Sequence, residues 1–185
     1  MTTRDAATTV VVKIGGSLLD LPNLAERIAE LPATLGAPCQ MVVGGGAAAD
    51  VVRSLHRCHR LSEATSHELA IGAMDLNAEF LRRLLDESTE SVGGLAVVPI
   101  RERLRELSQP LPSVWAVTSD SIAAAIATAG GHRLVLAKSI PPPQSIGVAV
   151  ARGQVDSYFP TAAAGLDVDW LNLRTPHPIA VRLAN

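Results

Sequence analysis

The chain has 185 residues, of which 48% are hydrophobic, 18% charged and only 3% aromatic, and its formal net charge is −2. This length and composition predict one globular domain with an aliphatic core and argue against intrinsic disorder. The small net charge, with Lys and Arg scattered along the chain, gives no electrostatic reason to expect a nucleic acid or an anionic membrane as partner.

Two further features of the sequence concern the cellular location. Residues 1–9 are polar and lack the apolar stretch of a secretory signal, so we expect none, and no run approaches the ~20 apolar residues that cross a bilayer. The two cysteines, Cys39 and Cys58, are typical of reduced thiols in a cytosolic protein. We therefore expect a cytoplasmic protein.

Strands and helices alternate in the first part of the chain. The β-branched run 10–14 predicts a strand, and a helix is expected from Asp20, its cap, to Pro32, which ends it. A second strand is predicted at 40–43, where three glycines stop it, and a helix follows at 47–58. Each strand in this part thus ends in a glycine-rich turn before a helix.

The same alternation continues through the middle of the chain. A long amphipathic helix opens at Ser62, followed by a strand at 95–98 and a short charged helix at 101–107. A fourth strand is predicted at 114–117 and a fifth at 134–137, on either side of an alanine-rich helix.

Toward the C-terminus the pattern is weaker, with strands expected at 145–150 and 179–183 and a helix near 157–164. Repeated strand–turn–helix units predict an α/β fold class, a three-layer αβα sandwich around a mainly parallel central sheet. No linker or internal repeat divides the sequence, so we expect a single domain over residues 1–185.

Glycine-rich or polar groups follow four of the predicted strands. In open parallel sheets, ligands bind at the carboxyl ends of the strands, so one edge would bring all four groups together. The groups are Lys13 with Gly15-Gly16-Ser17, then Gly44-Gly45-Gly46, then Thr118-Ser119-Asp120, and finally Lys138-Ser139.

The two glycine groups can be interpreted with or without a ligand. Glycines let the backbone turn tightly and aim N–H groups at an anion, and a following helix adds its positive end. A plain strand-to-helix turn explains Gly15-Gly16-Ser17 equally well, and a loose loop explains the triple glycine 44–46. Lys13 favours the anion, because a lysine in an apolar strand must reach solvent or meet a buried negative charge.

The charged candidates also have alternatives. Asp120 is expected either to cap a helix or to orient two lysines by ion pairing, and Lys138 is either a surface lysine or a second cation. Two lysines, backbone N–H groups and an aspartate are the groups that phosphoryl transfer needs, with Mg²⁺ arriving on the nucleotide and held mainly by phosphates. His56, Cys58 and His59 do not share one helix face, so no metal site is expected there.

Three segments together resemble the amino-acid kinase family, which includes acetylglutamate, aspartate, glutamate 5- and uridylate kinases; they are Val11–Ser17, Val42–Gly46 and Thr118–Ala124. The resemblance covers roughly residues 9–140. Four further segments are most similar to the short kinases of methanofuran biosynthesis, which phosphorylate an aminomethylfuran phosphate with ATP; these segments are 46–50, 67–75, Lys138-Ser139 and 155–160.

The resemblance implies a role for each candidate residue. Lys13 and Lys138 would be the catalytic cations, and Asp120 would hold them in position. The phosphates of the nucleotide would be bound by Gly15, Gly16, Ser17 and Ser139, and the acceptor by Gly44, Gly45 and Gly46. The family further implies ATP and Mg²⁺ as cofactors, a small-molecule substrate and a homo-oligomer.

The resemblance also divides the domain into two parts. Residues 9–137 would bind the acceptor and phosphates, and 138–185 would form a reduced nucleotide-binding part, since larger relatives have an Asp-Gly turn where this chain has Pro141-Pro142-Pro143. The leading expectation is ATP-dependent transfer to a small phosphorylated or carboxylated acceptor, with an aminomethylfuran phosphate as the most specific candidate. The alternative is a catalytically degenerate homologue that acts as an anion-binding, nucleotide-binding or assembly protein.

Overall fold

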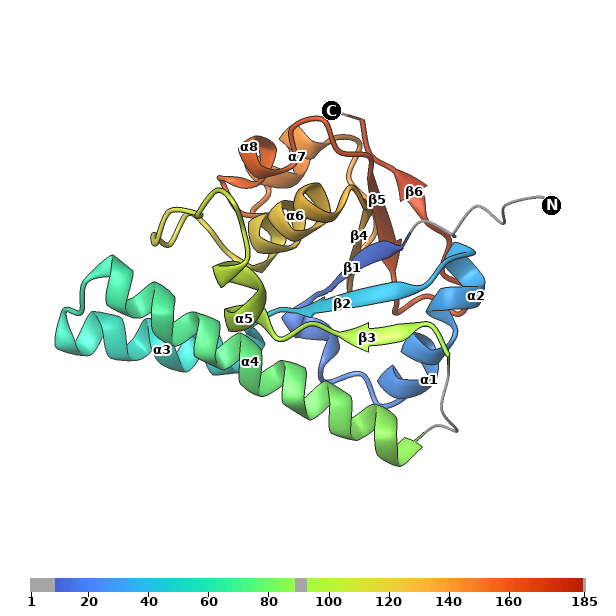
Figure 1. The fold of residues 1–185 in the computed structure, drawn as a ribbon, viewed down its shortest axis with the longest axis horizontal. Helices are drawn as coiled ribbons and strands as arrows, with labels where there is room; N and C mark the ends of the chain where they lie inside the picture. Colours follow the sequence, from blue (N-terminus) through green and yellow to red (C-terminus); the bar gives the residue numbers. More distant parts are fainter. Residues whose placement is uncertain (1–8, 89–92, 185) are drawn as a thin grey trace.

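The chain folds around one six-stranded sheet. In a computed structural model, which describes residues 9–88 and 93–184, the strand order is β3-β2-β1-β4-β5-β6 (Figure 1). Strands β1 to β5 pair in parallel, and β6 is antiparallel to β5. The strands are β1 (Val10–Ile14), β2 (Cys39–Val43), β3 (Leu95–Val97), β4 (Arg133–Lys138), β5 (Val168–Asn172) and β6 (Val181–Arg182).

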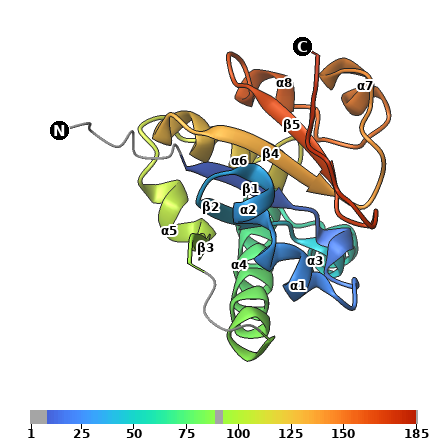
Figure 2. The ribbon, with the colours of Figure 1, turned by 90° about the vertical axis from the view of Figure 1, so that its right-hand side faces the viewer.

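Helices cover both faces of this sheet. Figures 1 and 2 show α7 and α8 toward the β5 end, and the α3–α4 pair toward the opposite end. Among the described residues, no helix is both long and apolar enough to cross a membrane. The helices are η1 (Gly16–Leu18), α1 (Leu24–Ala29), α2 (Leu31–Leu35), α3 (Gly46–His59), α4 (Glu63–Ser88), α5 (Ile100–Arg105), α6 (Ser119–Gly130), α7 (Ile146–Ala151) and α8 (Phe159–Ala162).

The central strands are buried on both sides, which explains their β-branched and aliphatic sequences. All five residues of β1 are buried. Because side chains alternate along a strand, Val11 packs with α6 on one face while Val12 and Ile14 pack with α1 on the other. In β4, Leu134 and Leu136 face α6 in the same way. This alternation decides where the polar ends of the two strands point.

The strand order also marks a ligand position. From β1 the chain builds outward through β2 and β3, and β4 then returns to pair with the other side of β1. A sheet whose connections diverge from two adjacent strands has a crevice at their carboxyl ends. The carboxyl ends of β1 and β4 are therefore the expected binding edge.

The structure confirms the predicted α/β sandwich with its mainly parallel sheet, but it corrects several elements. Residues 114–117 form a turn instead of a fourth strand, and the turn is closed by a hydrogen bond of 3.1 Å from Val117 N–H to Val114 C=O. Both long edges of β1 are already taken by β2 and β4, and Trp115 packs against His56 of α3 with ring centroids 5.6 Å apart. Tertiary packing therefore overrides the local preference for a strand.

The C-terminal region differs more. Residues expected as a strand at 145–150 form α7, whose first turn is capped by Ser145 Oγ accepting from Val148 N–H. Strand β5 was not predicted, because its alternation is interrupted by Asp169, which is buried through ion pairs with Arg133 and Arg182. The expected helix near 157–164 is confirmed as the shorter α8.

The first predicted helix is also wrong at both ends. Asn23, and not Asp20, precedes α1, and the Asp20 carboxylate accepts instead from Arg174. Pro32 does not end the helix but lies in the first turn of α2, where its missing N–H leaves no hydrogen bond unmade.

Candidate functional site

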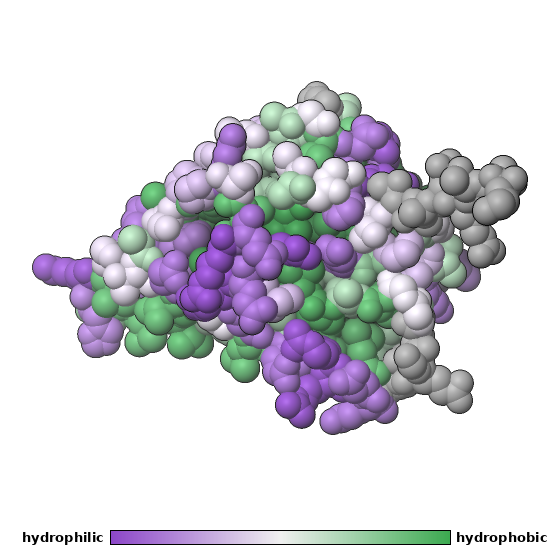
Figure 3. All heavy atoms as spheres, in the orientation of Figure 1, coloured by the Kyte–Doolittle hydropathy of each residue, from purple (hydrophilic) through white to green (hydrophobic). Residues whose placement is uncertain are grey.

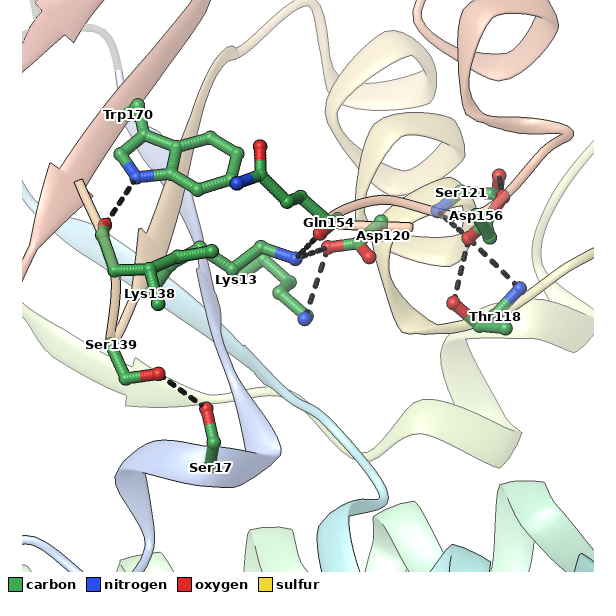
Figure 4. A network of polar contacts seen from close by, with 11 residues as sticks. Lys13, Ser17, Thr118, Asp120, Ser121, Lys138, Ser139, Gln154, Asp156 and Trp170 are labelled. Carbon is green, nitrogen blue, oxygen red and sulfur yellow. Dashed lines mark hydrogen bonds and ion pairs between the residues drawn. The ribbon is translucent and has the colours of Figure 1, made fainter. Parts of the chain in front are cut away.

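The two strand lysines and Asp120 meet at the predicted edge. Lys13 continues the face of Val11, and Lys138 continues the face of Leu136, so both ammonium groups point toward α6 (Figure 4). Asp120 lies in the first turn of α6. Its Oδ1 is 3.0 Å from Nζ of Lys13 and 2.7 Å from Nζ of Lys138.

This cluster is buried and carries a net positive charge. The side chains of Lys13, Asp120 and Lys138 are only 5%, 7% and 10% exposed. Two ammonium groups on one carboxylate leave one positive charge without a balancing partner inside the cluster. A buried charge without compensation is unfavourable, so the cluster is suited to receiving an anion.

The pKa shifts follow from this burial. Burial alone raises the pKa of Asp120, but the charges of Lys13 and Lys138 outweigh it and hold the pKa of this carboxyl below its ordinary value. Burial, and after it the charge of Lys13, lowers the pKa of Lys138 to about 8. Asp120 is therefore a fixed negative charge, while Lys138 can lose its proton slightly above neutral pH.

The lysine content of the chain makes this cluster unusual. Lys13 and Lys138 are the only two lysines in the sequence, and all other residues among its 16 Lys and Arg are arginines. An ammonium is a compact point charge whose pKa shifts on burial, whereas a guanidinium remains charged. Every lysine of the chain thus lies in this one cluster.

Lys138 has two further neighbours that the sequence did not indicate. Its Nζ donates to the backbone C=O of Gln154 at 2.7 Å and lies 5.5 Å from the ring centroid of Trp170. Trp170 is fully buried and donates from Nε1 to the C=O of Ile140. Both neighbours lie in the part of the chain after β4, where the sequence pattern was weakest.

The sequence left open whether Asp120 caps α6, and in the structure the start of α6 is capped by Asp156 instead. Asp156 accepts from the N–H and hydroxyl groups of both Thr118 and Ser121 at the start of α6. Asp120 makes ion pairs with the lysines instead. Sequence reasoning missed this cap because Asp156 is 35 or more positions away from the residues that it contacts.

The glycines bring the loops after β1 and β2 into direct contact. A Cβ atom on Gly16 would lie 2.4 Å from both N and Cα of Gly46, and Gly46 itself has a φ of +47°. This close approach between two backbones leaves no room for a side chain. The close approach alone explains why Gly16 and Gly46 are glycines, so no ligand is needed to account for them. It also holds the loops after β1 and β2 together at one edge of the sheet.

The N–H groups of the glycines differ in whether they already make hydrogen bonds within the protein. Gly15 N–H donates to Ala137 C=O at 2.8 Å, and Gly44 N–H donates to Ile14 C=O at 2.9 Å. Both groups extend the sheet and cannot also bind a ligand in this structure. The remaining candidate donors in the glycine loops are Gly16, Gly45 and Gly46.

Asn77 of α4 orients the second glycine loop. Its side-chain amide donates to the C=O of Gly44 at 2.7 Å and to the C=O of Gly45 at 2.8 Å. Because a trans peptide holds its N–H opposite to its C=O, the N–H groups of Gly45 and Gly46 point away from Asn77. Asn77 was not predicted, since it lies in the middle of a long helix and contacts a loop 32 or 33 residues earlier.

Ser17 and Ser139 also meet as the sequence predicted. Their hydroxyl oxygens are 2.9 Å apart, joining the turn after β1 to the turn after β4 (Figure 4). The described residues contain no group of three or more His, Cys, Asp or Glu side chains that could hold a metal ion. The site therefore offers ammonium groups, hydroxyls and amides, which are ligands for phosphate oxygens.

Comparison with known proteins gives two findings on the sequence. Residues 8–142 match the model of the family described as "Amino acid kinase family". The chain is 29% identical over 122 residues to the [5-(aminomethyl)furan-3-yl]methyl phosphate kinase of Methanocaldococcus jannaschii. That alignment covers 60% of this chain and 56% of the relative, so it spans little more than half of the relative's length.

Solved structures of low sequence identity share the fold. A uridylate kinase from Archaeoglobus fulgidus has a TM-score of 0.54 and 17% identity, with 95% of this chain and 91% of that chain covered. A UMP kinase from Ureaplasma parvum has a TM-score of 0.58 and 15% identity, with coverage of 93% and 92%. At this identity the likeness establishes the architecture alone.

Proposed function

This chain belongs to the amino acid kinase family, and we propose that it is an ATP-dependent phosphotransferase acting on a small phosphorylated or carboxylated acceptor. One observation carries the proposal, which is the buried pair of lysines on a single carboxylate with one unbalanced positive charge. Phosphoryl transfer requires little covalent work by the protein. It requires fixed positive charge where the transferring oxygens become more negative.

Each residue has a definite task in this proposal. The ammonium groups of Lys13 and Lys138 contact the transferring phosphoryl group, and Asp120 holds both without touching substrate. The N–H groups of Gly16, Gly45 and Gly46 bind phosphate oxygens, with Ser17 and Ser139 at the nucleotide side. Mg²⁺ would arrive with ATP and be held mainly by its phosphates, where it would neutralise their charge.

We further propose that the two parts of the chain divide the substrates. Residues 9–137 would bind the acceptor, and 138–185 would bind the nucleotide. The position of Trp170 beside Lys138 supports the second assignment, because this part of the chain packs directly against one of the two lysines. Two free cysteines, Cys39 and Cys58, fit the cytoplasm as the location of such an enzyme.

For the acceptor we propose an aminomethylfuran phosphate. The supporting observation is the Methanocaldococcus jannaschii relative, whose name states a furanylmethyl phosphate as its substrate. An acceptor phosphate would present a second anion to the same positively charged edge.

The test is an assay of phosphoryl transfer from ATP with Mg²⁺ to a set of phosphorylated and carboxylated acceptors, together with calorimetry of ATP binding. We expect nucleotide binding at millimolar ATP or below, and a diphosphate product when the acceptor is [5-(aminomethyl)furan-3-yl]methyl phosphate. Binding of ATP without transfer to any acceptor would favour a degenerate homologue. The absence of both binding and transfer would overturn the proposal.

We also propose that the protein is a homo-oligomer that associates through α3 and α4. Large apolar side chains are exposed on the outer surface of these helices, and Figure 3 shows hydrophobic surface along the lower edge of the molecule. Such a surface on a helix pair is typical of a protein contact. The exposed residues are Val51 (60%), Leu55 (43%), Leu69 (44%), Leu76 (64%) and Phe80 (46%).

The oligomer is tested by light scattering after size-exclusion chromatography. We expect Leu76→Asp to convert an oligomer into a monomer, because a charge in the centre of an apolar contact opposes association. Ile179→Asp is the matched control, since Ile179 is 75% exposed and lies outside α3 and α4. A monomeric wild type, or an equal effect of the two substitutions, would contradict the proposed contact.

A further inference from the structure

The segment between α7 and α8 contacts the end of β4, the start of α6 and the turn before α6 with alternate residues. Gln154 accepts from Lys138 Nζ through its backbone C=O, and Asp156 accepts from the start of α6. Tyr158 N–H donates to Ala116 C=O at 3.3 Å. Figure 4 shows Gln154 and Asp156 on either side of Asp120. One short segment is therefore attached both to β4 and to the helix that carries Asp120.

The contacts of Asp156 replace a missing local cap. Thr118 precedes α6, but its side chain makes no capping bond to the helix. The Oδ2 of Asp156 accepts from Thr118 N–H at 3.0 Å, from Thr118 Oγ1 at 2.7 Å and from Ser121 N–H at 3.1 Å, and Oδ1 accepts from the Ser121 hydroxyl. A carboxylate at this end of a helix also interacts favourably with the helix dipole.

Asp120 lies between the two residues that Asp156 binds. Thr118 is two positions before Asp120 and Ser121 is one after it, so the cap fixes the backbone on both sides of the catalytic cluster's only acid. The Asp156 carboxylate accepts from Thr118 and Ser121, whereas Lys13 and Lys138 form their ion pairs with Asp120. Its influence on the lysines must therefore pass through the position of Asp120.

The same segment is held by backbone and core contacts where it meets Lys138. Gln154 N–H donates to Ala149 C=O at 2.8 Å, and Val155 is buried in the core between the two contact residues. Residues 154–156 therefore link the start of α6 to the end of β4, in addition to the direct packing of α6 on the sheet.

We infer that Asp156 is a positioning residue, which holds the start of α6 so that the Asp120 carboxylate reaches both Lys13 and Lys138. The inference rests on the proposed function only for its effect on turnover. Its geometric part, the dependence of the Asp120–Lys138 ion pair on Asp156, holds whether or not the protein is a kinase.

Three variants test the inference. Asp156→Ala removes all four hydrogen bonds to Thr118 and Ser121. Asp156→Asn keeps an acceptor oxygen for three of them and offers its NH₂ group to the Ser121 hydroxyl, so it should restore the position of the helix. Gly131→Ala is the matched control, because it strains the opposite end of α6, where Gly131 has a φ of +62°.

The first measurement does not depend on activity. With ¹³C-labelled lysine, side-chain resonances arise from Lys13 and Lys138 alone, and Lys13→Arg assigns them. In Asp156→Ala we expect the pKa of Lys138 to fall below its value of about 8, because the carboxylate that favours the ammonium moves away. In Asp156→Asn and Gly131→Ala it should stay at the wild-type value.

The second measurement is steady-state kinetics of phosphoryl transfer. A displacement of about 1 Å in a catalytic group lowers rates by on the order of 10²-fold, so we expect Asp156→Ala to lower kcat by about that factor with a smaller change in KM for ATP. Asp156→Asn should recover kcat to within about tenfold of the wild type, because it preserves the hydrogen bonds that hold the helix start.

The outcomes separate the two proposals. If the wild type transfers no phosphate but Asp156→Ala still shifts the Lys138 titration, the proposed function fails and the positioning role stands. If Asp156→Ala matches Gly131→Ala in both measurements, the positioning role is overturned. Should Asp156→Ala not fold, Ser121→Ala removes one of the four bonds and is expected to shift both readouts in the same direction by less; no shift in it overturns the inference.

Discussion

Replacing Asp120 by asparagine is expected to lower the free energy of unfolding by about 3–5 kcal/mol at neutral pH, because a buried charge pair has lost one partner. The substitution leaves the ammonium groups of Lys13 and Lys138 together in a site where both are at least nine-tenths buried. No other described contact of the two amines supplies a full negative charge. Urea unfolding followed by Trp fluorescence measures the change.

The pH dependence of this variant identifies the cause. The pKa of Lys138 is lowered from 10.5 to about 8 in the folded wild type, so between these values the unfolded chain binds more protons and stability rises with pH. Without Asp120 the pKa of Lys138 falls further, and the window in which stability rises begins at a lower pH. We therefore expect the destabilisation to be smaller near pH 10.5 than at neutral pH.

Two comparisons control the Asp120 experiment. Asp50→Asn changes a carboxylate that is 71% exposed and paired with Arg53, and it should alter stability by less than about 0.5 kcal/mol. Adding Lys138→Met to Asp120→Asn removes one of the two uncompensated charges and should restore part of the lost stability. If Asp120→Asn alone were as stable as the wild type, the cluster would not hold two buried cations.

Replacing Lys13 by alanine is expected to lower turnover by about 10²–10³-fold while the fold is retained. The catalytic loss arises because one of the two cations at the transferring phosphoryl group is removed. The fold persists because the remaining Lys138–Asp120 pair is neutral, with Nζ and Oδ1 2.7 Å apart. Steady-state kcat and circular dichroism of the same preparation measure the two effects.

The matched control for Lys13 is the exposed Arg57→Ala in α3, which removes a positive charge outside the site and should leave kcat unchanged. A second readout is independent of catalysis. Because the charge of Lys13 lowers the pKa of Lys138, Lys13→Ala should raise that pKa above about 8. Wild-type turnover in Lys13→Ala would remove Lys13 from the mechanism.

The meeting of Lys13, Lys138 and Asp120 was predictable, because it follows from the alternation of side chains along each strand and from the order of strands and helices. Lys138 is the last residue of an apolar strand, and Lys13 is one residue before the end of another. Alternation along a strand fixes the face on which the two lysines lie once the strands are adjacent. Asp120 follows a turn and opens a helix, a place where polar groups commonly meet ligands. These three positions needed only local patterns and the rule that parallel strands end along one edge.

The rest of the site depends on contacts between distant residues. Asp156, Gln154, Asn77 and Trp170 act through partners 16 to 38 residues away in the sequence. No local pattern encodes such a pairing. The same limit explains why β5 was missed, since the burial of Asp169 depends on arginines from β4 and β6.

The restriction of lysine to one cluster has a consequence for chemical labelling. Reagents that acylate primary amines can modify only two side chains of this sequence, and both lie beside the Asp120 carboxylate. An amine-reactive nucleotide analogue would therefore label side chains only in the cluster around Asp120. The surface would stay unmodified, because its basic side chains are arginines. Digestion with a lysine-specific protease would report the result directly, because each blocked amine removes one cleavage site and joins two peptides.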